Sequence, residues 1–273
     1  MFDALIVGAG FAGSVLAERL ANEGDNRILL IDRRPHIGGN AYDRFDKAGN
    51  VIAPYGRHVL QTGDRRVINY LSRFAEWERY CSDGPDGGEA AEGAGEGGSM
   101  LVPSEGYTRM FETMLASPNV KIMLKVDYKE VRDLVPFRRL IYTGSLDDYF
   151  DYCYGRLPYW PAEKNGTAPH RAPARQFDAA EVVPERPEDK AGYPVAGDDS
   201  RALFQRYRDL AETAVDVYFT GRLPSYRYCT IDEVVVQSLA LFHQLKSEYP
   251  ADVAPRGNAG ARGPVRAVQA ANA

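Results

Sequence analysis

Apolar and polar positions in the first part of the chain predict a strand, a helix and a second strand. The apolar run FDALIV (2–7) is followed by the glycine-rich turn GAGFAG and by the helical pattern SVLAERLANE (14–23). A second apolar run, RILLI (27–31), ends at Asp32. This order, within about 30 residues, is that of a βαβ unit.

Later segments continue the alternation. Ile68, Leu71, Phe74 and Trp77 fall on one helical stripe, which predicts an amphipathic helix over 64–79. The other predicted elements are helices over 106–116, over 199–213 and from the capping pair Thr230 and Glu233 to about Lys246, and strands at VKIML (120–124), RLIYTG (139–144) and DVYFTG (216–221). Alternating strands and helices indicate a doubly wound α/β fold, here a Rossmann-like domain with an additional small sheet region.

Three stretches lack the apolar content of a packed core. Residues 82–99 hold seven glycines and five acidic residues, and residues 161–191 hold five prolines and eleven charges. Residues 250–273 form an alanine-rich tail. The expected organisation is an N-terminal part of the nucleotide-binding domain (1–80), a flexible linker (81–100), a sheet region (101–160), an irregular excursion (161–191), the C-terminal part of the domain (192–249) and a disordered tail (250–273).

Composition narrows the class of protein. A net charge of −5 argues against a nucleic-acid partner, and no apolar run approaches the ~20 residues of a membrane span. The N-terminus does not have the pattern of a signal peptide. Cys81, Cys153 and Cys229 show neither a disulfide framework nor metal-ligand spacing, so we expect no metal site. These features predict a cytoplasmic protein.

The glycines of the first turn predict a dinucleotide site. Gly8, Gly10 and Gly13 fit G-x-G-x-x-G between a strand and a helix, and Asp32 ends the next strand. In such a turn the backbone approaches a pyrophosphate, the helix N-terminus supplies donors, and the acid accepts from a ribose hydroxyl. A second pair, Gly38 and Gly39, follows the acid and favours FAD over NAD as the cofactor, although a plain turn would also account for it.

Two further residues are weaker candidates. Arg222 follows a predicted strand and precedes the helix at Thr230, so it could lie against an electron-rich flavin edge or belong to an ordinary loop. His58, in YGRHVLQTG, is a lone histidine, and a structural role is the commoner one.

Several strings of this sequence, taken together, resemble UDP-galactopyranose mutases. These strings are LIVGAGFAGSVLAERLA, DRRPHIGGNAYD, YGRHVLQT, GYTRMFETML, IYTGSLDDYFDYCYGRLPY, YPV and FTGRLPSYRYCTIDEVV. The resemblance implies a flavoenzyme that interconverts UDP-galactopyranose and UDP-galactofuranose for cell wall biosynthesis. In that family N5 of the reduced flavin attacks the anomeric carbon of the sugar, UDP leaves, and the ring reopens and recloses without net redox change.

The resemblance also implies roles for individual residues. His58 and Arg222 would be catalytic and lie beside the flavin, and Arg33 would join Asp32 at the adenosine ribose. Tyr193 and Tyr228 would hold the substrate diphosphate. The implied cofactor contacts are Gly8, Gly10, Phe11, Ala12, Gly13, Asp32, Arg33, Gly39, Asn40, His58, Val59, Arg222, Cys229, Thr230, Ile231, Asp232, Glu233 and Val234.

The chain departs from the family pattern in its substrate half. The glycine-rich segment 82–99 replaces a long helical segment that binds uridine and carries a diphosphate-binding arginine. The Pro-Tyr-Thr-Arg string, with a second such arginine, is not found in 160–191, and Gln61 replaces the second histidine of the YGxHIFHTN motif. Bidentate arginine is the usual partner of a diphosphate. Arg57, beside His58, is the predicted replacement; Arg171 and Arg175 are less favoured.

Two other readings of the same features stay open. The FAD-binding half could belong to an oxidoreductase that acts on a smaller substrate. Alternatively, the chain could be a remnant of the family that binds flavin without catalysing a reaction. The expected partners are a nucleotide sugar and a reductant such as NAD(P)H, with no nucleic acid and no membrane. The sequence does not determine the oligomeric state.

Overall fold

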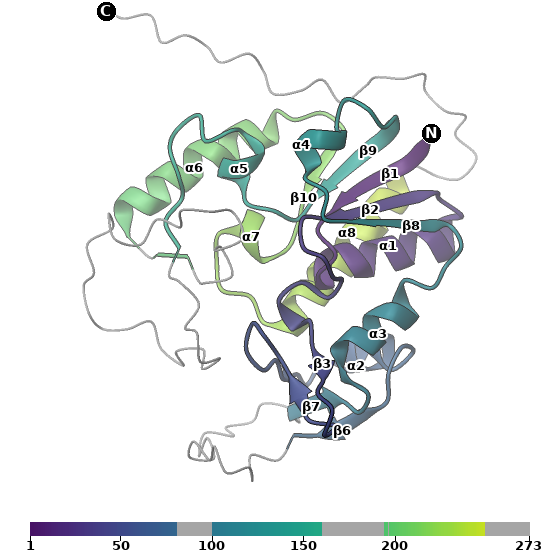
Figure 1. Cartoon of the computed structure of the whole chain (residues 1–273). Coiled ribbons are helices and arrows are strands. Elements are labelled where there is room, and N and C mark those ends of the chain that lie inside the picture. Colours follow the sequence, from purple (N-terminus) through teal and green to yellow (C-terminus); the bar gives the residue numbers. More distant parts are fainter. Residues whose placement is uncertain (81–99, 160–193, 196, 249–273) are drawn as a thin grey trace, which may run out of the picture.

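The computed structural model describes residues 1–80, 100–159, 194–195 and 197–248. Within these ranges a parallel sheet carries helices on both faces, and a smaller sheet region extends from one end of it (Figure 1). The predicted linker (apart from Met100), the excursion and the tail lie outside the described residues. The domain boundaries drawn there therefore stay predictions.

The central sheet has the strand order of a dinucleotide-binding fold. Its five strands run parallel in the order β10-β9-β1-β2-β8. Numbered along the chain, these strands read 3-2-1-4-5 from β8 to β10, so the order reverses between β1 and β9, where such folds bind ligands. The bounds are β1 Phe2–Val7, β2 Ile28–Asp32, β8 Val120–Leu124, β9 Phe137–Tyr142 and β10 Val217–Phe219.

Alternate side chains of β1 enter two separate cores. Ala4 and Ile6 pack beneath α1 (Phe11–Gly24) and α8 (Ile231–Glu248), which lie together on one face of the sheet. Leu5 and Val7 pack on the opposite face, toward α4 (Tyr128–Val131) and α5 (Leu146–Tyr149). Apolar side chains on both faces explain why this strand reads as a continuous apolar run.

The small sheet region lies beside the N-terminal end of α1 (Figure 1). It contains an antiparallel sheet β5-β7-β6 and a separate hairpin β3-β4, with α2 and α3 packed nearby. The bounds are η1 Gly39–Ala41, β3 Arg44–Phe45, β4 Val51–Ile52, β5 Leu60–Gln61, α2 Arg65–Leu71, β6 Trp77–Arg79, β7 Met100–Pro103 and α3 Gly106–Met114. The Phe11 ring joins this region to α1, because it meets Tyr107 and Phe111 of α3 edge-on at 5.8 and 4.9 Å between ring centroids.

A third group of elements packs through aromatic side chains. Helices α6 (Asp198–Glu212) and α7 (Arg222–Ser225) enclose a core with Tyr159, Tyr207 and Tyr226. The Tyr226 hydroxyl donates to the carbonyl of Pro158 at 2.6 Å.

Most predicted elements are confirmed, including the α/β fold class with its additional sheet region. The helix predicted over 64–79 is wrong in its second half: α2 ends at Leu71, and β6 begins at Trp77. Glu78 there pairs with Val102 of β7, and the Trp77 ring packs against Tyr107. These long-range contacts override a local helical stripe.

Glu18 of α1 is a fully buried carboxylate that the fold must neutralise. Burial alone would raise its pKa, but hydrogen bonds from Arg19, Asn22 and Tyr70 outweigh burial and lower the pKa below 4.5. Because Tyr70 belongs to α2, this cluster couples α2 to α1.

Replacement of Glu18 by Ala should destabilise the protein by about 3–5 kcal/mol, because Arg19 is left buried beside a lost partner. Glu23→Ala is the matched control: Glu23 also pairs with Arg19 but is partly exposed, so its loss should cost much less. Chemical denaturation of both variants measures the difference. Equal costs would show that the buried carboxylate is not the centre of the cluster.

Candidate active site

At the carboxyl ends of the parallel strands, backbone segments pass very close to neighbouring segments of the chain. Gly8 directly follows β1 with φ +103°, and a Cβ there would lie 2.0 Å from the Thr143 hydroxyl oxygen. Gly221, after β10, has φ +97°, and its Cβ would lie 3.1 Å from that of Ala12. Glycine at both positions therefore keeps this edge of the sheet narrow.

The N-terminus of α1 starts close against β1 and has no capping side chain within the described ranges. A Cβ on Gly13 would lie 1.9 Å from the Gly8 carbonyl oxygen, so only glycine lets the helix start this close to β1. Gly10 occupies the N-cap position, and no side chain of the described residues caps the helix there. Backbone N–H groups and the helix dipole are thus available to a pyrophosphate.

The second glycine pair packs directly on the first turn. A Cβ on Gly39 would approach Gly10 Cα to 2.9 Å, and the Gly38 N–H donates to the Ala9 carbonyl at 2.8 Å. The segment after β2 therefore packs against the glycine turn between β1 and α1. Asn40 and Ala41 are the next residues of this segment.

Asp32 is held in position by the backbone. Its two carboxylate oxygens accept from the N–H groups of Ala9 and Arg34, both at 2.8 Å. Each oxygen retains a second lone pair, so the carboxylate can still accept from a ribose hydroxyl. Arg33 points elsewhere, since its guanidinium pairs with Asp127 at 3.1 Å and with Asp148.

His58 and Arg222 come from distant segments and influence each other. Burial lowers the pKa of His58, and the positive charge of Arg222 lowers it further. The imidazole Nδ1 lies 2.9 Å from the Gly56 carbonyl oxygen, which fixes the ring. Arg222 is half-buried at the first position of α7. His58, which precedes β5, therefore lies within electrostatic range of Arg222, which follows β10.

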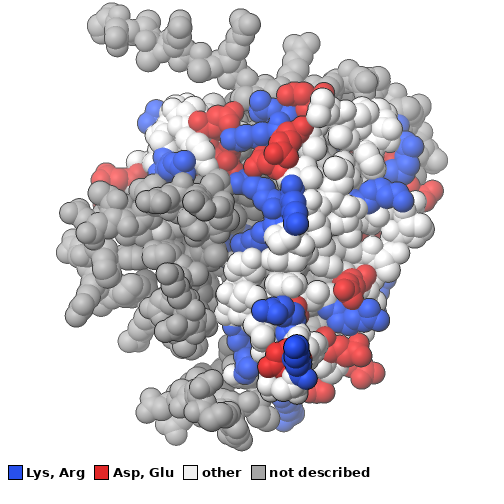
Figure 2. Space-filling view, in the orientation of Figure 1, with Lys and Arg blue, Asp and Glu red and all other residues white. Residues whose placement is uncertain are grey.

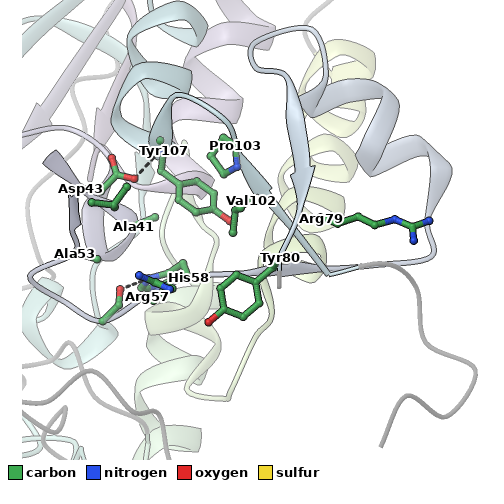
Figure 3. Close-up of a pocket in the computed structure, with 13 residues that line it drawn as sticks. Ala41, Asp43, Ala53, Arg57, His58, Arg79, Tyr80, Val102, Pro103 and Tyr107 are labelled. Carbon is green, nitrogen blue, oxygen red and sulfur yellow. Dashed lines mark hydrogen bonds between the residues drawn. The ribbon is translucent and has the colours of Figure 1, made fainter. Parts of the chain in front are cut away.

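A cavity of about 300 Å³ opens next to His58 (Figure 3). Arg57, Tyr80 and Tyr107 are among its lining side chains, with Ala41 and Asp43 at its base. Asp43 also connects two walls, because its carboxylate accepts from the N–H groups of Tyr107 and Thr108 at 2.7 and 2.8 Å at the start of α3.

The start of α8 completes the site. The Thr230 N–H donates to the Glu233 carboxylate at 2.9 Å, which is one half of the predicted capping box. Cys229 and Val234 are buried and pack on Ala12 of α1. The positions Ile231 and Asp232 are half-buried, as are Asn40 and Val59 at the other wall.

The residues predicted to bind the substrate are less closely grouped than those predicted to bind the cofactor. Tyr228 is 58% exposed, and Arg57 is exposed at the cavity mouth. Tyr193, Arg171 and Arg175 lie outside the described residues.

Tyr80, Tyr107 and Asp43 belong to this site, but the sequence did not single them out. Asp43 and Tyr107 do lie in the strings DRRPHIGGNAYD and GYTRMFETML, which carry the family resemblance. Their role depends on a contact between segments about 60 residues apart, which periodicity does not reveal.

The site has no group of three or more metal-ligating side chains placed around a metal ion, and neither has the rest of the described chain. None of the helices in the described ranges is both long and apolar enough to cross a membrane. On the face shown in Figure 2, basic and acidic side chains are interspersed.

Comparison with known protein families gives two matches. The UDP-galactopyranose mutase family model matches residues 100–168 and 175–228, and a model of NAD(P)-binding Rossmann-like domains matches residues 6–74. A probable UDP-galactopyranose mutase of Klebsiella pneumoniae is 25% identical, in an alignment that covers 86% of this chain and 92% of the relative. The chain is thus similar to UDP-galactopyranose mutases along most of its length.

Other relatives agree with this assignment. A UDP-galactopyranose mutase of Mycoplasma genitalium is 48% identical over 80 residues, which cover 29% of this chain and 20% of the relative. A dTDP-fucopyranose mutase of Escherichia coli is 21% identical, covering 88% and 97%. The Klebsiella alignment has 359 positions and this chain has 273 residues, so the relative carries internal segments without a counterpart in the mutase-like chain.

Solved structures support the fold. The crystal structure of reduced UDP-galactopyranose mutase superposes with a TM-score of 0.62 at 11% identity, covering 91% of this chain and 94% of the other. The mutase-like chain also shares its fold with a fatty acid isomerase from P. acnes, with a TM-score of 0.51 at 12% identity and coverage of 89% and 98%.

The depressed pKa of His58 predicts a pH dependence of stability in the mutase-like chain. In the unfolded chain histidine titrates near 6.5, whereas the folded protein takes up this proton only at lower pH. The free energy of unfolding should therefore fall as pH drops below about 6.5, by about 1.4 kcal/mol for each unit by which the pKa is depressed.

Unfolding of wild type and His58→Gln at pH 7.5 and pH 5.5 measures this effect. The variant should lose less stability on acidification than wild type. An identical loss in both proteins would contradict a depressed pKa, and an NMR titration of the His58 ring checks it directly.

Proposed function

We propose that the chain binds FAD and, with the flavin reduced, interconverts UDP-galactopyranose and UDP-galactofuranose. The observation that supports this most is the convergence of both glycine turns, Asp32, His58 and Arg222 at the carboxyl edge of one sheet. An NAD(P)H-type reductant would generate the reduced form.

The residues present fit a dinucleotide with an extended second half. The uncapped start of α1 would bind the pyrophosphate, and Asp32 would bind the adenosine ribose. Gly39 lets the segment after β2 pack on the turn, because a Cβ there would clash with Gly10, and Asn40, the next residue, would contact the cofactor. The start of α8, which packs on Ala12, would lie along the ribityl chain.

The reacting end would be set by His58 and Arg222. When bound, the reduced flavin would supply the nucleophilic nitrogen for the anomeric carbon of the sugar, in place of a protein side chain. Arg222 would place positive charge against the electron-rich flavin edge and the departing diphosphate. His58 would stay neutral at neutral pH, because burial and Arg222 lower its pKa, so it can accept or donate a hydrogen bond at Nε2.

The substrate diphosphate would be held by Tyr228, Tyr193 and Arg57. Arg57 is the arginine beside His58, at the mouth of the cavity. A guanidinium can contact two phosphate oxygens at once, which compensates for the diphosphate-binding arginines found in the family and absent from this sequence.

The first prediction concerns the cofactor. Purified protein should show a flavin spectrum, and Asp32→Ala should weaken FAD binding by about 1–3 kcal/mol, because two backbone donors and the ribose lose their acceptor. Asp133→Ala, at an exposed carboxylate, is the control and should bind FAD as wild type does. Protein that stays colourless after reconstitution with FAD would contradict the proposal.

The second prediction concerns the reaction. Protein reduced with dithionite should convert UDP-galactofuranose to UDP-galactopyranose, and chromatography measures the conversion. Addition of borohydride during turnover should trap the sugar on the flavin. Arg222→Ala should lower kcat by at least about tenfold, the cost of one charge-assisted contact. Flavin binding without turnover or trapping would favour the oxidoreductase or the non-catalytic reading.

A further inference from the structure

The cavity beside His58 is distinct from the dinucleotide turn. Its lining residues come from 41–58, 79–80 and 102–107. Among the described residues, neither the turn Gly8–Gly13, nor Arg222, nor the start of α8 contributes to it. A dinucleotide that runs from the turn to Arg222 would therefore leave this cavity free. His58 would then lie between the dinucleotide and the cavity.

The cavity has the surface of a site for a flat ring. Tyr107 and Tyr80 reach toward it from α3 and from the end of β6, and Val102 and Ala53 add apolar surface (Figure 3). A volume of about 300 Å³ is at the small end of the range for ligand pockets.

One polar group in the wall lacks an acceptor. Tyr107 is 4% exposed; the Leu60 backbone N–H interacts with its hydroxyl oxygen, but the hydroxyl itself donates no hydrogen bond to any described residue. Buried hydroxyl groups are ordinarily hydrogen-bonded, so an unused donor in a cavity wall indicates a ligand acceptor. A ring carbonyl would provide one.

The mouth of the cavity carries a positive charge. The Arg57 guanidinium lies 5.7 Å from the centre of the Tyr80 ring, which keeps it at the rim. Arg79 is the neighbouring arginine, but Figure 3 shows its side chain directed away from Tyr107 and His58. An anion that follows the ring out of the cavity would therefore meet Arg57.

We propose that this cavity binds the pyrimidine base of the nucleotide sugar. The base lies between the Tyr107 and Tyr80 sides of the cavity, the Tyr107 hydroxyl donates to a base carbonyl, and Arg57 pairs with a phosphate. This assignment rests on the proposed nucleotide-sugar substrate, and it directs the sugar past His58 toward the flavin. It assigns base binding to the sheet region of this chain.

Calorimetric titration of the FAD-loaded, oxidised protein with UMP tests the proposal without requiring turnover. Tyr107→Phe should weaken UMP binding about three- to tenfold, as for one neutral hydrogen bond. Arg57→Ala should weaken it about tenfold or more, and Arg79→Ala, the matched control, should bind UMP as wild type does. The variants should keep the wild-type FAD content and flavin spectrum.

The melting temperature of Tyr107→Phe distinguishes a ligand-binding role of the hydroxyl from a structural role, since loss of a structural group would lower it. Because the hydroxyl donates to no acceptor in the described chain and only the Leu60 N–H interacts with its oxygen, Tyr107→Phe should change the melting temperature little. UMP binding by wild type that Tyr107→Phe and Arg57→Ala leave intact would overturn the proposal. A changed flavin spectrum in Tyr107→Phe would also overturn it, because the flavin ring would then occupy the cavity.

The outcomes separate this inference from the proposed reaction. Tyr107-dependent UMP binding without turnover would leave the base site standing and contradict the mutase reaction. Turnover with UMP affinity independent of Tyr107 and Arg57 would contradict the base site alone. Absence of UMP binding by wild type at millimolar concentration would overturn the base site.

Discussion

The close approach of backbone segments at the carboxyl edge of the sheet is the constraint on which the rest of the structure depends. Gly13 lets α1 begin against β1, and Gly39 lets the chain after β2 pack on Gly10. A Cβ at Gly13 would lie 1.9 Å from the Gly8 carbonyl oxygen and one at Gly39 would lie 2.9 Å from Gly10 Cα, so either would force these segments apart. These two contacts fix where α1 and the segment after β2 lie relative to β1, beside the segments that lead to His58 and the cavity.

The small sheet region is attached to this edge by side chains as well as by backbone. Phe11, the first residue of α1, packs edge-on against Tyr107 and Phe111 of α3. Asp43 binds the first N–H groups of the same helix. One helix therefore receives an aromatic contact from the nucleotide turn and an ionic cap from the segment after it, which holds the cavity at a set place beside the turn.

Electrostatics in the site follow from burial rather than from dense ion pairing. His58 is kept neutral because it is desolvated and lies near Arg222, and Asp32 is oriented by two backbone donors. In contrast, Arg33 is committed to Asp127 and Asp148, so its charge serves to connect β2 with α4 and α5. A guanidinium that lines the cavity is therefore not that of Arg33, which follows Asp32, but that of Arg57, 24 residues further along the chain.

The sequence by itself determined the βαβ unit, the glycine turn with Asp32 and the α/β class, because these depend on local periodicity and on residues within one supersecondary unit. It also identified most later helices and strands. Tertiary structure alone decided that residues 77–79 form a strand, because β7 supplies the pairing partner and Tyr107 the packing surface. It also decided that Asp43, Tyr80 and Tyr107 share a cavity with His58, since their proximity arises from contacts between segments far apart in the chain, and such contacts leave no period in the sequence.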